Sequence, residues 1–235
     1  PYATHSHACV VAGGRFHVIG GYDAAATLSA SDKVSSAPIN TNGTLGAFVL
    51  TGSVTPGRTS HRAVVSNGAL YVLGGQRQSN ARQETFGGAI NADGTVTAIV
   101  PLVNLDVPRR DFAAVSVNGT ITVIGGRDTL GTLTSVAAAR VAPSLTAENF
   151  DPNAGIFTDA RAHHAAVSYR GSLYVIGGLG AAPVGSVEVA PWLEAGGVGG
   201  FTSFPMTARH RHSANASNGW LYVIGGLLGF NSPSV

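Results

Sequence analysis

Arginine is the side chain with the clearest chemical potential in this sequence, and it recurs at regular spacing. Arg58, Arg109, Arg161 and Arg209 lie 51, 52 and 48 residues apart. Guanidinium groups bind carboxylates in a bidentate manner, so a ring of arginines could bind an anionic ligand or an acidic peptide. The alternative is that each arginine bonds carbonyls or a carboxylate of the adjacent unit. Repetition in every unit favours this structural role, because a specific function usually breaks symmetry.

Histidine recurs in the same units. His61, His164 and His212 each lie thirteen residues before a pair of glycines, as does His7. Imidazole is a common zinc and copper ligand, but ligands must converge to about 2 Å from one ion. Equivalent positions in successive units spread around a ring instead. We therefore predict packing and hydrogen bonding for these histidines, with ligand contact as the alternative, and we expect no metal site and no cofactor.

Carboxylates and other reactive groups are sparse. The chain has twelve Asp and Glu residues, and no two share a register that would form a close acid–base pair. No phosphate-binding loop, zinc motif or Gly-x-Ser-x-Gly elbow is present. Cys9 takes the place of an alanine in the other units, which suits a small apolar side chain. We predict no catalytic residues.

Charge and apolar patterning exclude two kinds of partner. The formal net charge is only +2 and the basic residues form no cluster, which argues against nucleic-acid binding. The longest apolar stretch, 219–230, is shorter than the ~20 residues of a membrane span. A single lysine among many Ser, Thr and Gly residues is typical of exported bacterial proteins. We therefore expect an extracytoplasmic or secreted location.

The elements that position these residues come from an internal repeat. A double glycine follows an apolar run five times, beginning at Gly20, Gly74, Gly125, Gly177 and Gly225, with spacings of 54, 51, 52 and 48 residues. Asn-Gly precedes three of these runs, and Asn-Gly between apolar runs predicts a two-residue hairpin turn. The rest of each unit has room for two more strands. The pattern predicts four strands per unit of about 50 residues.

The unit from Arg58 to Gly75, repeated from Arg161 to Gly178, resembles the kelch motif. Asn42 to Phe48 is similar to a segment of bacterial kelch-like proteins. The third unit departs from the pattern at Phe112 and Thr122. The resemblance implies an all-β propeller of four-stranded antiparallel blades in one region, 1–235. We expect four blades at about 4–57, 58–108, 109–160 and 161–208, and the first hairpin of a fifth at 209–235.

Four and a half blades leave a propeller ring incomplete. We expect either that the chain is a piece of a longer protein or that another chain, including a second copy, completes the ring at the open edge. One side of each blade carries Asn-Gly turns that are too short to build a pocket. The other carries the strand 2–3 and inter-blade loops, where binding residues are expected. These loops are 22–28, 76–82, 127–132 and 179–184, so Arg77, Arg82 and Arg127 become individual ligand-binding candidates.

The function that this reading favours is non-catalytic binding of a protein or glycan partner through the loop face. A kelch-type enzyme is one alternative, because the family includes proteins similar to copper-dependent galactose oxidases and to sialate epimerases. The galactose oxidases need a cysteine–tyrosine cross-link beside two histidines and a further tyrosine, and that set has no place on this chain. The other alternative is a structural subunit of a surface assembly.

Overall fold

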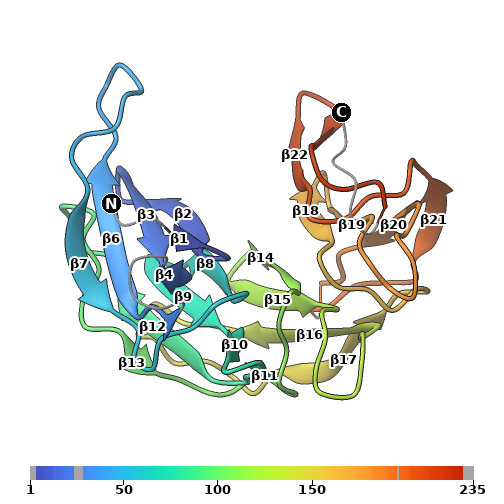
Figure 1. Ribbon diagram of the computed structural model, residues 1–235, viewed down its shortest axis with the longest axis horizontal. Helices are drawn as coiled ribbons and strands as arrows, with labels where there is room; N and C mark the ends of the chain where they lie inside the picture. The colour runs from blue at the N-terminus through green and yellow to red at the C-terminus, as the bar shows by residue number, and fades with distance from the viewer. Residues whose placement is uncertain (1–3, 24–28, 195, 230–235) are drawn as a thin grey trace. The chain divides into compact units, whose positions relative to one another are not determined.

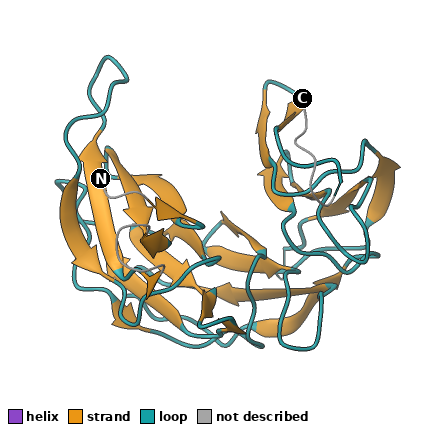
Figure 2. Ribbon diagram, viewed as in Figure 1, coloured by secondary structure: helices purple, strands orange, loops and turns teal. Residues whose placement is uncertain are grey.

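The computed structural model describes residues 4–23, 29–194 and 196–229. Strand is the only regular secondary structure in these ranges, and Figure 2 shows strands joined by loops. Runs such as Leu70-Tyr71-Val72-Leu73 combine β-branched and aromatic residues, which favour extended backbone. The predicted all-β class is confirmed. The same ranges contain no apolar helix of membrane-spanning length.

The chain divides into two compact units. Unit 1 comprises 1–110 and 140–149, and unit 2 comprises 111–139 and 150–235.

Unit 1 contains two four-stranded antiparallel sheets. In sheet order, the first has β2 (Ala8–Ala12), β3 (Arg15–Ile19), β6 (Lys33–Pro38) and β7 (Val49–Ser53). The second has β8 (Arg62–Ser66), β9 (Ala69–Leu73), β12 (Thr85–Ala89) and β13 (Val100–Pro101) (Figure 1). Strand order follows chain order in both sheets, as the repeat predicts.

Unit 2 contains two further sheets of the same kind and one hairpin. The first has β14 (Ala113–Val117), β15 (Thr120–Ile124), β16 (Ser135–Arg140) and β17 (Asp151–Ile156). The second has β18 (Ala165–Tyr169), β19 (Ser172–Ile176), β20 (Ser186–Pro191) and β21 (Thr202–Pro205). The hairpin consists of β22 (Ser213–Ser217) and β23 (Trp220–Ile224).

Hairpin turns join the first two strands of each sheet as predicted. Asn67 and Gly68 have φ of 48° and 75°, and Ser66 pairs with Ala69 across them. Positive φ at both central residues is the signature of a type I′ turn, whose twist matches that of the flanking strands. The Asn-Gly signal therefore fixes the register of these strand pairs.

Apolar side chains fill the space between neighbouring sheets within each unit. Ile19 and Val34 pack with Leu70, Val72 and Phe86 in unit 1. A second cluster in unit 2 is built in the same way from Ile124, Val136, Phe157, Leu173 and Val175, among others. The first strands of successive sheets also contact one another, β2 with β8, β14 with β18, and β18 with β22.

Short strands extend the connections between the second and third strands. In the first repeat, β1 (Thr4–His5), β4 (Tyr22–Asp23) and β5 (Ser29–Ala30) form a small sheet. In the second repeat, β10 (Gln76–Arg77) and β11 (Asn80–Ala81) form a hairpin. Residues 24–28 of the first of these predicted loops lie outside the described residues. The remaining loop residues are held by backbone pairing and form a fixed surface.

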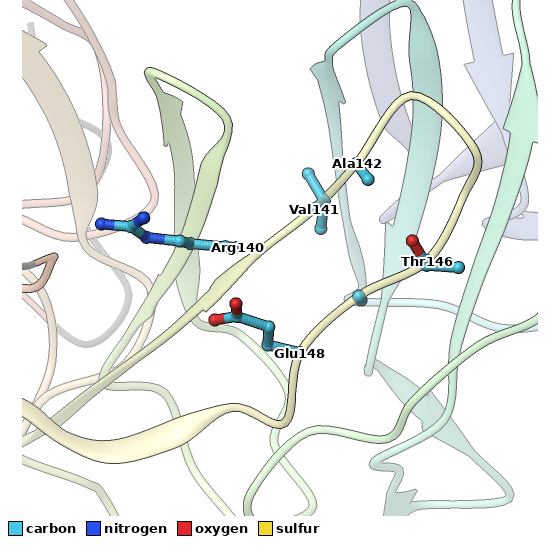
Figure 3. Close-up of a pocket in the computed structure, with 6 residues that line it drawn as sticks. Arg140, Val141, Ala142, Thr146 and Glu148 are labelled. Atoms are coloured by element: carbon cyan, nitrogen blue, oxygen red, sulfur yellow. The ribbon is translucent and has the colours of Figure 1, made fainter.

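The structure differs from one expectation about the side of the sheets that carries the strand 1–2 turns. The connection between the third and fourth strands is ten residues long in all four sheets, and it closes on itself through a bridge such as Val141 to Ala147. In unit 1, the loop that follows β16 borders an open depression of about 270 Å³. Arg140 and Glu148 lie on the two arms of this loop (Figure 3). The premise that this side has only two-residue turns was wrong, because it considered only the strand 1–2 turns.

Candidate functional site

The recurring arginines serve the sheets themselves. Their Nη1 atoms donate to the carbonyl of the first glycine of the pair in their own repeat, Arg58 to Gly74 at 2.8 Å and Arg161 to Gly177 at 3.0 Å. Arg209 makes the same bond to Gly225 at 3.1 Å. The side chain thus bonds within its own repeat, whereas an adjacent unit was expected. These bonds give the arginines a structural role, which is the role that their repetition favoured.

The backbone of the same arginines reaches the preceding repeat. The second glycine of each preceding pair donates its N–H to an arginine carbonyl, Gly21 to Arg58 at 2.9 Å and Gly178 to Arg209 at 2.8 Å. A Cβ on the first glycine would lie 2.7 Å from the Arg58 oxygen at Gly20 and 2.5 Å from the Arg209 oxygen at Gly177. Only glycine allows this approach, so the glycine pair and the arginine form one joint between neighbouring sheets.

The buried arginines are compensated for their loss of hydration. Arg161 bonds the Glu188 carboxylate and the Ser186 hydroxyl, and both side chains of the Arg161–Glu188 ion pair have no exposed surface. Arg109 donates to both Asp106 oxygens at 2.8 Å. Arg58 stacks on Phe86 at 4.3 Å, and burial lowers its pKa to about 10. Buried cations that already have partners are poor ligand contacts.

The recurring histidines pack against the same glycines. His61, His164 and His212 are buried, and each packs its Cε1 atom against a glycine of the preceding repeat. A Cβ added at that glycine would lie 2.8 Å from the histidine Cε1 at Gly20, 3.0 Å at Gly125 and 2.8 Å at Gly177. Burial lowers the pKa of His61 to about 3 and that of His212 to about 4, with the nearby Arg58 and Arg209 charges adding to the effect. His61 and His212 are therefore neutral packing groups at pH 7, and His164 packs in the same position. Across the described ranges, no three His, Cys, Asp or Glu side chains lie close enough to share a metal ion.

A cavity of about 330 Å³ opens in unit 1 between the strand 2–3 loops of the first two repeats. Its lining comes from both loops and from the inter-repeat segment, and consists of Tyr22, Ser29, Ala30, Gly57, Thr59, Gln76, Arg77, Gln78 and Ser79. The volume lies within the range of small-molecule sites. The predicted candidate Arg77 is part of it. Arg82, from the same loop, is not, because it pairs with Glu84.

Hydrogen bonds hold the cavity wall in place. Arg110 donates to the Gln76 side-chain oxygen at 2.6 Å, and the Gln76 amide donates to the Tyr22 hydroxyl at 3.3 Å. Backbone bonds in both directions join Thr59 to Gln76. Thr59 is fully buried, and its hydroxyl has no hydrogen-bond partner among the described residues. The wall is therefore preorganised and retains one hydroxyl with unused capacity.

The turn between β10 and β11 is strained. Gln78 and Ser79 have φ of 49° and 68°, and Arg77 pairs with Asn80 across them, so this is another two-residue hairpin turn. Asn-Gly suits such a turn, whereas other L-residues cost about 1–2 kcal/mol each in the left-handed region. Both strained residues line the cavity. Strain of this kind tends to be retained where it positions functional groups.

The composition of the cavity suits binding better than catalysis. Among its described lining residues there is no Asp, Glu, His or Cys, hence no acid–base pair and no activated nucleophile. Hydroxyls, two amides, one guanidinium and the Tyr22 ring provide hydrogen-bond donors, acceptors and an aromatic face. This set can bind a polar ligand that carries hydroxyl groups and an anionic group.

A second group of residues, missed by the sequence analysis, occupies one equivalent position in every repeat. Ser6, Ser60, Asp111, His163 and Arg211 have φ between 52° and 57°, and we call them the rim residues. They are linked by backbone bonds, from Ser60 N–H to Ser6 in unit 1, and from His163 to Asp111 and Arg211 to His163 in unit 2. The sequence does carry a signal for the rim residues. Their position lies between the recurring arginine and histidine, and its residue type changes from repeat to repeat while the arginine and histidine recur.

In unit 2, three rim residues bring charged groups together. Asp111 Oδ1 lies 3.6 Å from His163 Nδ1, with 9% and 17% of these side chains exposed. The pKa of His163 is lowered to about 4, chiefly by burial; Asp111 opposes the shift, and Arg211, Arg127 and His210 contribute to it. The predicted candidate Arg127 is thus close enough to act on His163 electrostatically. No such cluster was predicted.

Comparison of the chain with protein-family models and with curated protein sequences gives no match.

Proposed function

We propose that this chain is a kelch-type β-propeller region whose loop face binds glycans without catalysis, through the unit 1 cavity. The observation that carries the proposal is a preorganised polar cavity, built from two strand 2–3 loops, whose described lining has no catalytic acid, base or nucleophile. The phased repeats, the four-stranded sheets and the contacts between successive first strands support the propeller.

The ligand class follows from the chemistry of the lining. A sugar presents hydroxyl groups that both donate and accept, which matches the Gln76 and Gln78 amides and the Ser79 hydroxyl. The Tyr22 ring offers a flat surface for a sugar face. Arg77 is the charged side chain of the lining, and a guanidinium favours a carboxylate. We therefore propose acidic oligosaccharides as the preferred ligands.

The two alternatives have weaker support. An enzyme of the galactose-oxidase or sialate-epimerase type would need reactive groups, and the described lining offers none beyond Arg77 and Tyr22. A structural subunit would use an apolar edge, and Trp220 and Ile224 of β23 are 70% and 64% exposed. We therefore rank both alternatives below glycan binding. The secreted location is a further proposal.

Calorimetric titration with cellobiouronic acid, and with neutral cellobiose as its matched ligand, tests the proposal. We expect Arg77→Ala to weaken binding of the acidic sugar at least tenfold, since a hydrogen bond to a charged group contributes ~1.5–3 kcal/mol. Gln78→Asn shortens an amide of the lining, tolerates the left-handed backbone and should weaken both sugars. Arg82→Ala is the matched control, because Arg82 lies in the same loop but outside the cavity, and it should bind within twofold of the parent chain.

Two outcomes would count against this function. Failure of the parent chain to bind either these disaccharides or any member of a printed array of acidic and neutral oligosaccharides would remove the glycan assignment. Binding that Arg77→Ala and Arg82→Ala reduce equally would remove the cavity as its location.

A further inference from the structure

The rim of unit 2 holds a cluster that the glycan site does not use. It consists of Asp111, Arg127, His163, His210 and Arg211, and its centre is the Asp111–His163 pair at 3.6 Å. Its members come from three successive repeats. No residue of this cluster lines the unit 1 cavity.

The backbone at the cluster is specialised. His163 and Arg211 have φ of 53° and 57°, in the left-handed region that L-residues adopt only at an energetic cost. Glycine would adopt this conformation freely, yet the described rim residues carry side chains in both units. The same position carries serine twice in unit 1 but an acid, an imidazole and a guanidinium in unit 2. This departure from symmetry indicates a role beyond holding the sheets together.

Two buried polar atoms of the cluster have no hydrogen-bond partner among the described residues. They are Arg127 Nε, a donor, and His210 Nδ1. The other nitrogen of His210, Nε2, lies 3.1 Å from the Gly229 carbonyl, and the side chain is 2% exposed. A carbonyl can only accept, so Nε2 is the donor of this bond, and Nδ1 is the nitrogen left to accept from a ligand. Unpaired buried polar groups are unfavourable, and a ligand with an anionic acceptor and a hydroxyl donor would pair them.

We propose that Arg127, His163 and Arg211 form a binding site for a small hydroxycarboxylic acid at the rim of unit 2. The carboxylate accepts from the two guanidinium groups, and the hydroxyl donates to His210 Nδ1. Asp111 faces His163 from the preceding repeat and borders the site. The inference concerns residues other than those of the glycan cavity and does not depend on it.

Ligand binding at this site takes up a proton. In the free protein, burial keeps His163 neutral, Asp111 opposes this effect, and the Arg211 and Arg127 charges add to it. A bound carboxylate screens these cations and raises the pKa of His163. Binding therefore tightens as the pH falls from 7 toward 5, and each unit by which the His163 pKa rises allows up to about a tenfold gain in affinity.

Citrate is the probe, titrated into the whole chain at constant ionic strength and followed by the NMR shift of the His163 Cε1–H. We expect saturable binding, an upward shift of the His163 pKa, and a loss of at least tenfold in affinity in Arg211→Gln and in Arg127→Gln. His163→Asn tolerates the left-handed backbone and should bind citrate with only the pH dependence that the citrate carboxyl groups contribute. Arg170→Gln removes an exposed unit 2 arginine that stacks on Tyr169, and it should bind as the parent does.

Several results would overturn the inference. One is a His163 resonance whose titration citrate does not move. Another is equal weakening by Arg170→Gln and Arg211→Gln, which would indicate charge attraction alone. A tetraglutamate peptide that binds tenfold tighter than citrate would replace the small-molecule ligand with an acidic protein segment. Arg77→Ala should leave citrate binding unchanged, so this site and the glycan cavity succeed or fail separately.

Discussion

The buried Arg161–Glu188 pair offers the sharpest test of how the repeats hold together. Both side chains have no exposed surface, and Glu188 also accepts from the Thr158 backbone N–H at 2.7 Å. Truncation by Glu188→Ala leaves a buried guanidinium and a buried N–H without their acceptor. Removing one partner of a buried pair costs about 3–5 kcal/mol. Arg161 keeps the Gly177 carbonyl and a longer contact of 3.4 Å to Asp159, which places the expected loss of unfolding free energy near the lower end.

Urea unfolding at pH 7, followed by tryptophan fluorescence, measures this loss. The two tryptophans of the chain, Trp192 and Trp220, are both in unit 2, and Trp192 packs against the core that Arg161 and Glu188 flank. Glu188→Gln keeps an oxygen for the Thr158 N–H and should lose about 2 kcal/mol, less than Glu188→Ala. Glu194→Ala removes an exposed carboxylate from the same unit and should stay within about 0.5 kcal/mol of the parent chain.

A Glu188→Ala variant that loses less than about 1 kcal/mol would refute the reasoning, because Arg161 would then be stable without its charged partner. Equal losses in Glu188→Ala and Glu188→Gln would show that charge, and not the Thr158 hydrogen bond, accounts for the whole effect.

Two further predictions concern the joint between neighbouring sheets. Folded His61 has its pKa lowered to about 3, so below pH 6.5 the unfolded state binds a proton that the folded state does not, and stability is lost by about 1.4 kcal/mol per pH unit. His61→Phe copies Phe112 of the third repeat and should flatten the decline in urea midpoint between pH 6.5 and 4; an unchanged slope would contradict a neutral His61. Gly177→Ala should lose at least about 3 kcal/mol, because its Cβ would lie 2.5 Å from the Arg209 oxygen, whereas Gly171→Ala meets no atom within 4 Å and should lose about 1 kcal/mol. Similar losses in the two alanine variants, again by urea unfolding, would show that the close approach is not limiting.

Local chemistry explains why so much of the architecture could be predicted. A type I′ turn needs positive φ at two adjacent residues, so Asn67-Gly68 determines the hairpin of β8 and β9 within a few residues of chain. The recurring Arg58 and His61 could be read as structural because repetition places them in the same environment each time. The length of the strand 3–4 loops was missed because only the strand 1–2 turns were considered on that side of the sheets.

Strand content and the repeat with its hairpin turns could be predicted from the sequence, since they depend on backbone conformations that neighbouring residues encode. Which loop residues meet depends on tertiary packing. It joined Tyr22 to Gln76, 54 positions away, left Arg82 paired with Glu84 outside the cavity, and brought Asp111 to 3.6 Å from His163. Such contacts cross from one repeat to the next, so they follow from how the sheets pack and from no pattern within a single repeat.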